Sequence, residues 1–140
     1  MENVARARPG VALDGALIEA MAPRGLELMV GAKRDPAWGP VLVLGLGGIW
    51  VEALGDVRLL PPDATQETIV EELLRLRSAK LLRGFRGAPA VDVAAVARAA
   101  ALIGRLILTV AEIIEIDVNP LVAHPLGQGV TALDALIVTD

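Results

Sequence analysis

Glu115-Ile116-Asp117-Val118-Asn119 is the most informative stretch of the sequence, because polar and apolar residues alternate along it. A period of two is typical of a β-strand that has one buried and one open face. The alternation therefore places Glu115, Asp117 and Asn119 on the same face of one strand. Polar groups on an apolar strand need partners when they are buried, so this face is a candidate site.

A second polar position follows on the next strand of the sequence. The segments after Val118 predict, in order, a turn at Asn119-Pro120, a resumed strand at Leu121–Ala123, a hairpin loop at Pro125–Gly129 and a returning strand at Val130–Val138. The returning strand contains Asp134. If the two strands pair through the hairpin, Asp117, Asn119 and Asp134 converge.

These three side chains allow two interpretations. Carboxylates and an amide form an all-oxygen ligand set, which suits Mg²⁺ shared with a substrate phosphate. In the alternative interpretation, the same residues form the solvated face of an edge strand. The spacing by itself leaves both interpretations open.

The remaining chain predicts a mixed α+β domain in which two helices pack on several antiparallel strands. Further strands are expected at Leu26–Val30, Val41–Leu44 and Val57–Leu60, with a turn at Asp35–Pro40 between the first two. One helix is expected over about 64–78, with Asp63 as its N-cap and Gln66 completing a capping box, and 81–89 is expected to be a loop. Asp92 is the expected N-cap of an Ala-rich helix that ends near Thr109. Gly104 within it costs about 1 kcal/mol relative to Ala.

Composition excludes several classes of protein. The 140 residues are 54% hydrophobic and 21% charged with a net charge of −4, which indicates one folded domain and argues against disorder. The longest charge-free stretch near the middle, 36–51, contains two prolines and four glycines, so no membrane-spanning helix is expected. Two Trp, one Phe and no Tyr leave no stacking platform for nucleic acid. The absence of cysteine fits a cytoplasmic protein.

A glycine-rich turn provides a second candidate site. Gly45-Leu46-Gly47-Gly48 follows an expected strand and precedes Glu52. Closely spaced glycines let backbone N–H groups approach a phosphate, although no Lys-Ser/Thr follows as in a Walker A loop. A tight turn without a ligand is the alternative interpretation.

Taken together, these motifs resemble the ATP-grasp region of NDP-forming acyl-CoA synthetases. The similarity is to the acetate–CoA ligase (ADP-forming) β-subunit type, which is related to the succinyl-CoA synthetase β subunit. The matching segments, in order, are Gly31–Pro40, Gly45–Glu52, Asp56-Val57, Leu82–Gly87, Asp92, Glu115–Leu121 and Leu133–Ala135. The resemblance covers about residues 14–140.

The resemblance implies roles for particular residues. Asn119 and Asp134 match positions that hold Mg²⁺, and Asp117 matches an acidic position beside them that faces the phosphoryl-transfer site. Glu19 and Met21 match a hinge segment that lies against adenine. Glu27 matches an acidic residue that binds the ribose hydroxyls. Gly47 and Gly48, with Glu52, match a glycine loop near the transferred phosphate. Exposed strand-end carboxylates are the alternative for Glu27 and Glu52, and His124, the single histidine, is expected to be an ordinary loop residue.

The resemblance also defines what is expected of the chain as a whole. Residues 1–13 are expected to be a tail, and 14–140 to be the hinge and second subdomain of an ATP-grasp domain. The implied function is ATP/ADP and Mg²⁺ binding for phosphoryl transfer to a phosphohistidine on a partner. The first subdomain and the CoA-binding and phosphohistidine domains would come from such partners, and the chain alone would be inactive and prone to associate.

The alternative is a non-catalytic remnant or a regulatory or oligomerisation module. A variant of this alternative is a synthetase-like region related to a protein lysine acetyltransferase.

Overall fold

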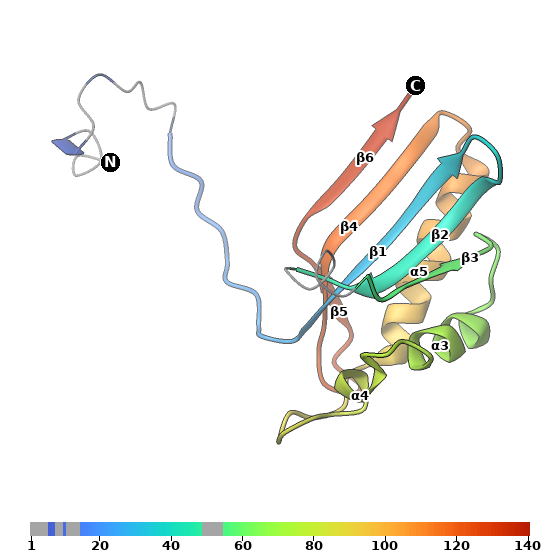
Figure 1. The fold of residues 1–140 in the computed structure, drawn as a ribbon. Helices are drawn as coiled ribbons and strands as arrows, with labels where there is room; N and C mark the ends of the chain where they lie inside the picture. The colour runs from blue at the N-terminus through green and yellow to red at the C-terminus, as the bar shows by residue number, and fades with distance from the viewer. Residues whose placement is uncertain (1–5, 8–9, 11–14, 49–54) are drawn as a thin grey trace.

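The computed structural model describes residues 6–7, 10, 15–48 and 55–140 (Figure 1). The strands are β1 (Leu26–Asp35), β2 (Gly39–Leu46), β3 (Val57–Leu60), β4 (Ile113–Ala123), β5 (Val130–Ala132) and β6 (Ala135–Thr139). The helices are α3 (Gln66–Leu74), α4 (Ala79–Leu82) and α5 (Val93–Thr109). Residues 15–25 precede β1 as an extended segment outside the sheet (Figure 1).

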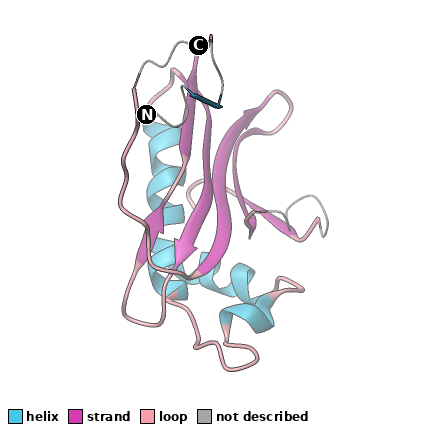
Figure 2. Cartoon of the chain, turned by 90° about the vertical axis from the view of Figure 1, so that its left-hand side faces the viewer, coloured by secondary structure: helices cyan, strands magenta, loops and turns pink. Residues whose placement is uncertain are grey.

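All the strands belong to one antiparallel sheet. The order is β3-β2-β1-β4-β5, and β6 pairs with β4 beyond the point where β5 ends. Figure 2 shows α5 lying along one face of this sheet. No helix of the described part covers the opposite face, which is called the open face below. The predicted α+β domain, with a mostly antiparallel sheet and two main helices, α3 and α5, is confirmed.

The core lies between the sheet and these helices. Period-two alternation in β1 turns Leu28, Val30 and Ala32 toward α5, and all three are buried. The largest fully buried side chains come from both layers: Leu28, Leu42, Leu44, Ile69, Leu73, Leu82, Ile107, Val30 and Val96. The other side chains of β1 and β4 therefore remain available on the open face.

Arg34 joins the two layers at one end of the sheet. Its Nε donates to the carbonyl of Ile113 at 2.7 Å, and its Nη2 donates to the carbonyl of Val110 at 3.1 Å and to that of Ile107. The guanidinium thus satisfies carbonyls at the C-terminus of α5, where a positive charge is favourable.

Asp92 caps α5 as predicted and also fastens the hairpin beside it. Only 6% of Asp92 is exposed. Its carboxylate accepts hydrogen bonds from the backbone N–H groups of Ala95 at 2.9 Å, Gly129 at 3.1 Å and Gly127 at 3.2 Å. The Ala95 N–H makes the largest contribution to lowering the pKa of Asp92, and together the bonds outweigh the opposing effect of burial. The charged form is therefore the one that stabilises the fold.

This arrangement predicts a pH-dependent stability. The pKa of Asp92 is lower in the folded protein than in the unfolded chain. Its charge therefore contributes fully to the free energy of unfolding at pH values above the pKa of the unfolded chain. This contribution is lost as the pH falls through the pKa of the folded protein. We expect the difference in unfolding free energy between the wild type and Asp92→Asn to shrink from about pH 6 to about pH 2. Urea denaturation across this range measures it. A difference that stays constant with pH would contradict the role of the charge.

The first helix differs from the prediction. It begins at Gln66 with Thr65 as the N-cap, whose side chain accepts from the Thr68 N–H at 3.2 Å, so the predicted Asp63 cap is wrong. It ends at Leu74 rather than near Ser78, because the Asp56 carboxylate binds the backbone N–H groups of residues 77 and 78. A short helix, α4, then occupies Ala79–Leu82, part of which was expected to be a loop.

The turn predicted at Asn119-Pro120 is wrong, because β4 runs through it. Between the pairs Leu28↔Leu121 and Val30↔Val118, β4 has one residue more than β1, which is a β-bulge. The predicted strand Val130–Val138 is divided into β5 and β6, with Asp134 between them, and this break lies opposite the bulge of β4. The backbone bonds Asn119 N–H to the Asp134 carbonyl (3.2 Å) and Leu133 N–H to the Pro120 carbonyl (3.1 Å) connect the two irregular segments.

No helix in the described part of the chain is long and apolar enough to span a membrane. The predicted tail, residues 1–13, falls almost entirely outside the described residues.

Candidate functional site

Three elements meet at one point of the open face. β1 contributes Glu27, the end of β2 leads into Gly47 and Gly48, and β4 contributes Asn119 at its bulge. The Gly48 N–H donates to the Asn119 Oδ1 at 3.3 Å, and the Gly47 N–H donates to the Glu27 carbonyl at 2.9 Å. The structure therefore brings together four residues that the sequence singled out separately.

Gly48 requires a glycine for its conformation, because its φ is +63°. A Cβ atom added to it would meet the end of the Glu27 side chain, which is flexible enough to move. Gly47 is confined by backbone, because a Cβ there would lie 2.7 Å from the backbone oxygen of Leu28. The glycine pair thus lets the backbone approach Glu27 and Asn119 closely.

Acidic side chains gather next to this point, along β4 and after β5. Burial raises the pKa of Asp117 above its ordinary value, and the negative charges of Glu115 and Asp134 raise it further. Asp134 lies across from Asn119, to which its carbonyl is bonded. The expectation that Asp117, Asn119 and Asp134 converge is thus consistent with the observed pairing of strands.

The side-chain oxygens of Asp117, Asn119 and Asp134 are suitable ligands for Mg²⁺. They are the carboxylates of Asp117 and Asp134 and the amide oxygen of Asn119, which has a second lone pair besides the one facing Gly48. Among the described residues, no group of three or more His, Cys, Asp or Glu side chains could hold a metal ion. A cation would therefore need the Asn119 oxygen and oxygens of a ligand, as Mg²⁺ sites that share substrate phosphates do.

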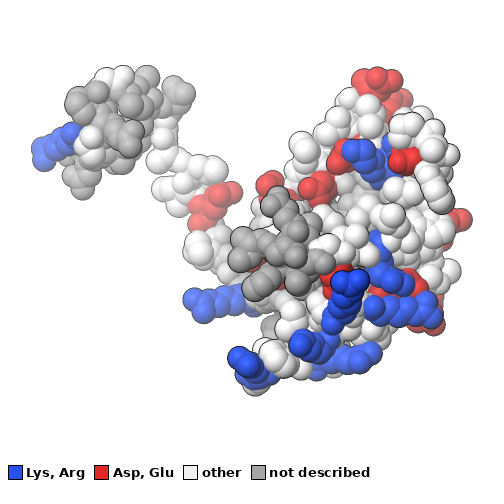
Figure 3. All heavy atoms as spheres, in the orientation of Figure 1, with Lys and Arg blue, Asp and Glu red and all other residues white. Residues whose placement is uncertain are grey.

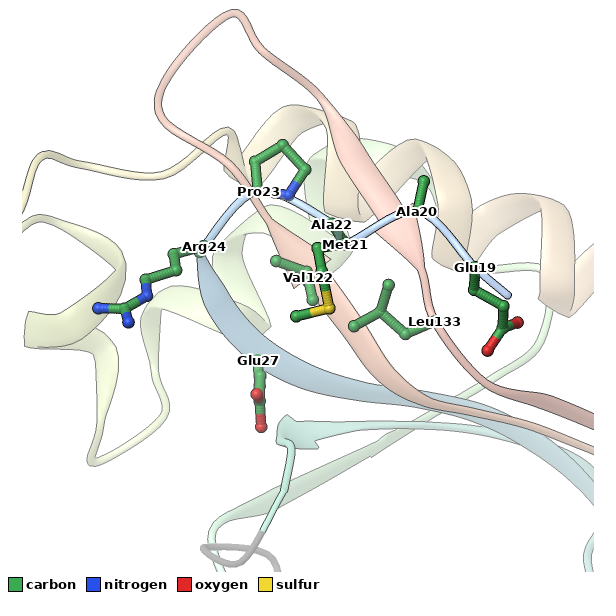
Figure 4. A pocket seen from close by; sticks show the side chains of 10 residues that line it. Glu19, Ala20, Met21, Ala22, Pro23, Arg24, Glu27, Val122 and Leu133 are labelled. Carbon is green, nitrogen blue, oxygen red and sulfur yellow. The ribbon is translucent and has the colours of Figure 1, made fainter. Parts of the chain in front are cut away.

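A pocket of about 590 Å³ opens beside Glu27. It is lined by residues 19–25, by Glu27 and by Val122 and Leu133. In Figure 4 the Met21 side chain points toward the same space as Val122 and Leu133, whereas Glu27 points away from them toward the end of β2. The pocket thus has an apolar part at Met21 and a carboxylate at its other side, and Met21 itself is 95% exposed.

One residue that the sequence assigns to the site, Glu52, lies outside the described residues. Val122 and Leu133 line the pocket but were not singled out, because an apolar residue next to a polar site residue has no distinctive signal in a sequence. His124 is in the loop as expected and is buried there, with its Nε2 2.8 Å from the Thr131 Oγ1 and its carbonyl bonded to the Asp92 N–H.

Comparisons with known proteins show the family to which the chain belongs. A family model described as the ATP-grasp domain matches residues 1–139. A trans-feruloyl-CoA synthase from an unknown prokaryotic organism is 48% identical over 138 residues, which cover 99% of this chain and 20% of that protein. The β subunit of acetate–CoA ligase (ADP-forming) I from Pyrococcus furiosus is 37% identical over 138 residues, which cover 99% of this chain and 59% of that protein.

Solved structures give the same result. The dinucleotide-forming acetyl-coenzyme A synthetase 1 of Candidatus Korarchaeum cryptofilum, in complex with coenzyme A, acetyl-coenzyme A and a phosphorylated phosphohistidine segment, superposes with a TM-score of 0.84 at 37% identity. That match covers 99% of this chain and 61% of the other. Another structure of that enzyme contains coenzyme A and Mg-AMPPCP. The chain spans less than two thirds of the length of each of these relatives. The match over nearly all of its length shows that the chain belongs to the ATP-grasp domain family.

Proposed function

We propose that this chain is the nucleotide- and Mg²⁺-binding portion of an ADP-forming acyl-CoA synthetase. The observation that supports this most is the meeting of Glu27, Gly48 and Asn119 on the open face, with Asp117 and Asp134 beside them. The complete enzyme would convert acyl-CoA, ADP and phosphate into a carboxylic acid, CoA and ATP. The phosphoryl group would pass through a phosphohistidine on a partner domain.

Each part of the site has a role in this proposal. The apolar part of the pocket, at Met21, Val122 and Leu133, takes the adenine, with Glu19 at its edge. Glu27 accepts hydrogen bonds from the ribose hydroxyls. The backbone at Gly47 and Gly48 approaches the phosphates, because closely spaced N–H groups suit anions.

The acidic group holds the metal. Asn119, Asp134 and Asp117 would bind Mg²⁺ on the nucleotide phosphates. When bound, Mg²⁺ neutralises part of the phosphate charge and fixes the orientation of the phosphates. Burial and, after it, the negative charges of Glu115 and Asp134 raise the pKa of Asp117, and a cation bound beside these carboxylates would offset their repulsion.

Partners complete the enzyme in this proposal. They supply the first ATP-grasp subdomain and the CoA-binding and phosphohistidine domains, in one oligomer in the cytoplasm. The structures of the Korarchaeum enzyme support this, since one of them has the phosphohistidine segment pointing towards the nucleotide-binding site. Phosphoryl transfer depends on positioning and electrostatics, so this chain without partners would bind nucleotide but not turn it over.

Glu27→Ala tests the ribose assignment. We expect the affinity for ADP to fall by about 1–3 kcal/mol, because a charged hydrogen-bond acceptor is lost. The wild type should bind 2′,3′-dideoxy-ADP more weakly than ADP, and the variant should not distinguish the two. Calorimetric titration in the presence of Mg²⁺ measures all four affinities.

The control is Glu71→Ala, which removes an exposed carboxylate from α3, away from the open face. It should leave both affinities unchanged. If Glu27→Ala still prefers ADP to its dideoxy form as strongly as the wild type does, the assignment of Glu27 is wrong.

A further inference from the structure

Beyond the acidic group, the open face continues to an ion pair that the proposed roles leave unexplained. The Lys33 Nζ lies 2.9 Å from the Glu115 Oε2. β1 and β4 pair so that Lys33 faces Glu115 and Gly31 faces Asp117. The ion pair therefore lies two residues, or about 7 Å, further along both strands than Asp117.

The order of groups along these two strands gives the site a direction. Val122 lies opposite Glu27 at the pocket end, the bulge with Asn119 follows, then comes Asp117, and finally Lys33 with Glu115. If a nucleotide with its base in the pocket and its ribose on Glu27 extended its phosphates along this line, its terminal phosphate would point toward Lys33.

Lys33 and Asp117 also share a hollow. A shallow pocket of about 190 Å³ is lined by both of them, by Glu115 and by the small or apolar residues between them. Gly31 forms part of its floor, where a Cβ would lie 2.9 Å from the Ile116 carbonyl oxygen. The floor between Lys33 and Asp117 therefore has no side chain on β1.

Charge distinguishes Lys33 within this hollow. Among the described residues that line the hollow, Lys33 is the only cationic one. Most of the Lys and Arg side chains visible in Figure 3 lie instead at the end of the molecule with α3 and α4. An ammonium group is a compact charge on a flexible stem, which suits a phosphate.

The fold does not depend on this ion pair. The side chains of Lys33 and Glu115 are 57% and 37% exposed. Exposed pairs of this kind contribute little to stability. Lys33 can therefore leave Glu115 for a stronger anion without loss of structure.

We propose that Lys33 binds the terminal phosphate of a nucleoside triphosphate, and that Glu115 holds the Lys33 ammonium when no triphosphate is present. This inference rests on the proposed function, because it assumes that the nucleotide lies along β1 and β4. It adds a residue that distinguishes triphosphate from diphosphate. Glu115 acts as a positioning residue that competes with the ligand.

The two substitutions have opposite expected effects. Lys33→Met keeps the apolar stem and should weaken Mg-AMPPCP binding about tenfold, with Mg-ADP binding unchanged. Glu115→Gln removes the competing charge and should strengthen Mg-AMPPCP binding about two- to threefold. Lys33→Arg should retain the preference for AMPPCP. If the pair had only a structural role, each variant would change the affinities for Mg-AMPPCP and Mg-ADP alike. The change would also have the same direction in Lys33→Met and Glu115→Gln.

A spectroscopic measurement reports on Lys33 directly. Lys33 and Lys80 are the only lysines of the sequence, so reductive ¹³C-methylation gives two lysine signals besides that of the terminal amine, and dimethylation keeps the charge. Lys80 lies over Phe85, 5.2 Å from the ring centroid, and serves as an internal reference. Mg-AMPPCP should shift the Lys33 signal, assigned by its loss in Lys33→Arg, while Mg-ADP should shift it less and Lys80 should not respond.

The outcomes separate the two proposals. If Mg-ADP binds and Asn119→Ala abolishes that binding, but AMPPCP leaves the Lys33 signal and the Lys33→Met affinity unchanged, the inference about Lys33 is wrong and the proposed function stands. If neither nucleotide binds to the wild-type chain, both proposals are overturned for this chain.

Discussion

Substitution of Asp134 by alanine is expected to abolish Mg²⁺-dependent binding of ADP. Asp134 would be a charged ligand of the cation, and the loss of such a group costs about 3 kcal/mol or more, which weakens binding by at least about 100-fold. Asn119→Ala should act in the same direction, since it removes the amide oxygen across from Asp134. Calorimetric titration of each variant with ADP, with and without Mg²⁺, measures the loss.

The fold of the Asp134 variant should remain intact. Asp134 is exposed and lies between β5 and β6, so its removal breaks no core contact. Because its charge raises the pKa of Asp117, its removal should leave the free energy of unfolding equal to or slightly above that of the wild type. Asp63→Ala, in the exposed segment before α3, is the matched control and should bind like the wild type. Equal affinity in the wild type, Asp134→Ala and Asn119→Ala would overturn the metal assignment.

Gly104→Ala should lower the stability of the protein, although helix propensity predicts a gain. In an isolated helix, alanine is favoured over glycine by about 1 kcal/mol. In α5, a Cβ atom on Gly104 would lie 2.1 Å from the Pro62 carbonyl oxygen and 3.0 Å from its carbonyl carbon. Both contacts are with backbone, so α5 or the segment before α3 must move. We expect a net loss of about 1–3 kcal/mol in the free energy of unfolding.

Urea denaturation measures this loss. Arg105→Ala changes the next, exposed position of α5 and should alter stability by no more than about 0.5 kcal/mol. A Gly104→Ala variant that is more stable than the wild type would show that the close approach of α5 to Pro62 does not limit this position. The packing of α5 would then not explain why position 104 is a glycine.

The features that the sequence predicted well are local ones. Alternation from Glu115 to Asn119 indicates a strand with one polar face, and Asp92 before an Ala-rich run indicates a helix cap. The hairpin loop at Pro125–Gly129 follows from its Pro and Gly residues. Each depends on a few neighbouring residues, and the structure has each of them.

The features that the sequence could not predict depend on residues far apart in the chain. Asp63 and Thr65 are both capable N-caps, and the sequence does not distinguish them, whereas the turn at Pro61–Asp63 does so in the structure. Arg34 is an ordinary strand residue until the end of α5 is placed beside it. From the sequence, Gly104 is only a weak helix former, whereas in the structure it lies against the backbone of Pro62.

The candidate site shows the same division. Its residue types and the strand that bears them could be identified in advance, and the family resemblance assigned them roles. The contact of Gly48 with both Glu27 and Asn119 required the folded sheet, because it joins three strands. At Asn119-Pro120 the sequence predicts a turn where the structure has a β-bulge, since Pro is common in both.

Calorimetric titration of the wild-type chain with ADP, with and without Mg²⁺, tests the central claim most directly. The claim is that the open face of this sheet holds a Mg²⁺–nucleotide complex through β1, β4 and the glycines after β2. We predict binding of about millimolar strength that requires Mg²⁺, an interaction of about 4 kcal/mol. Binding that is equal with and without Mg²⁺, or no binding at all, would contradict it.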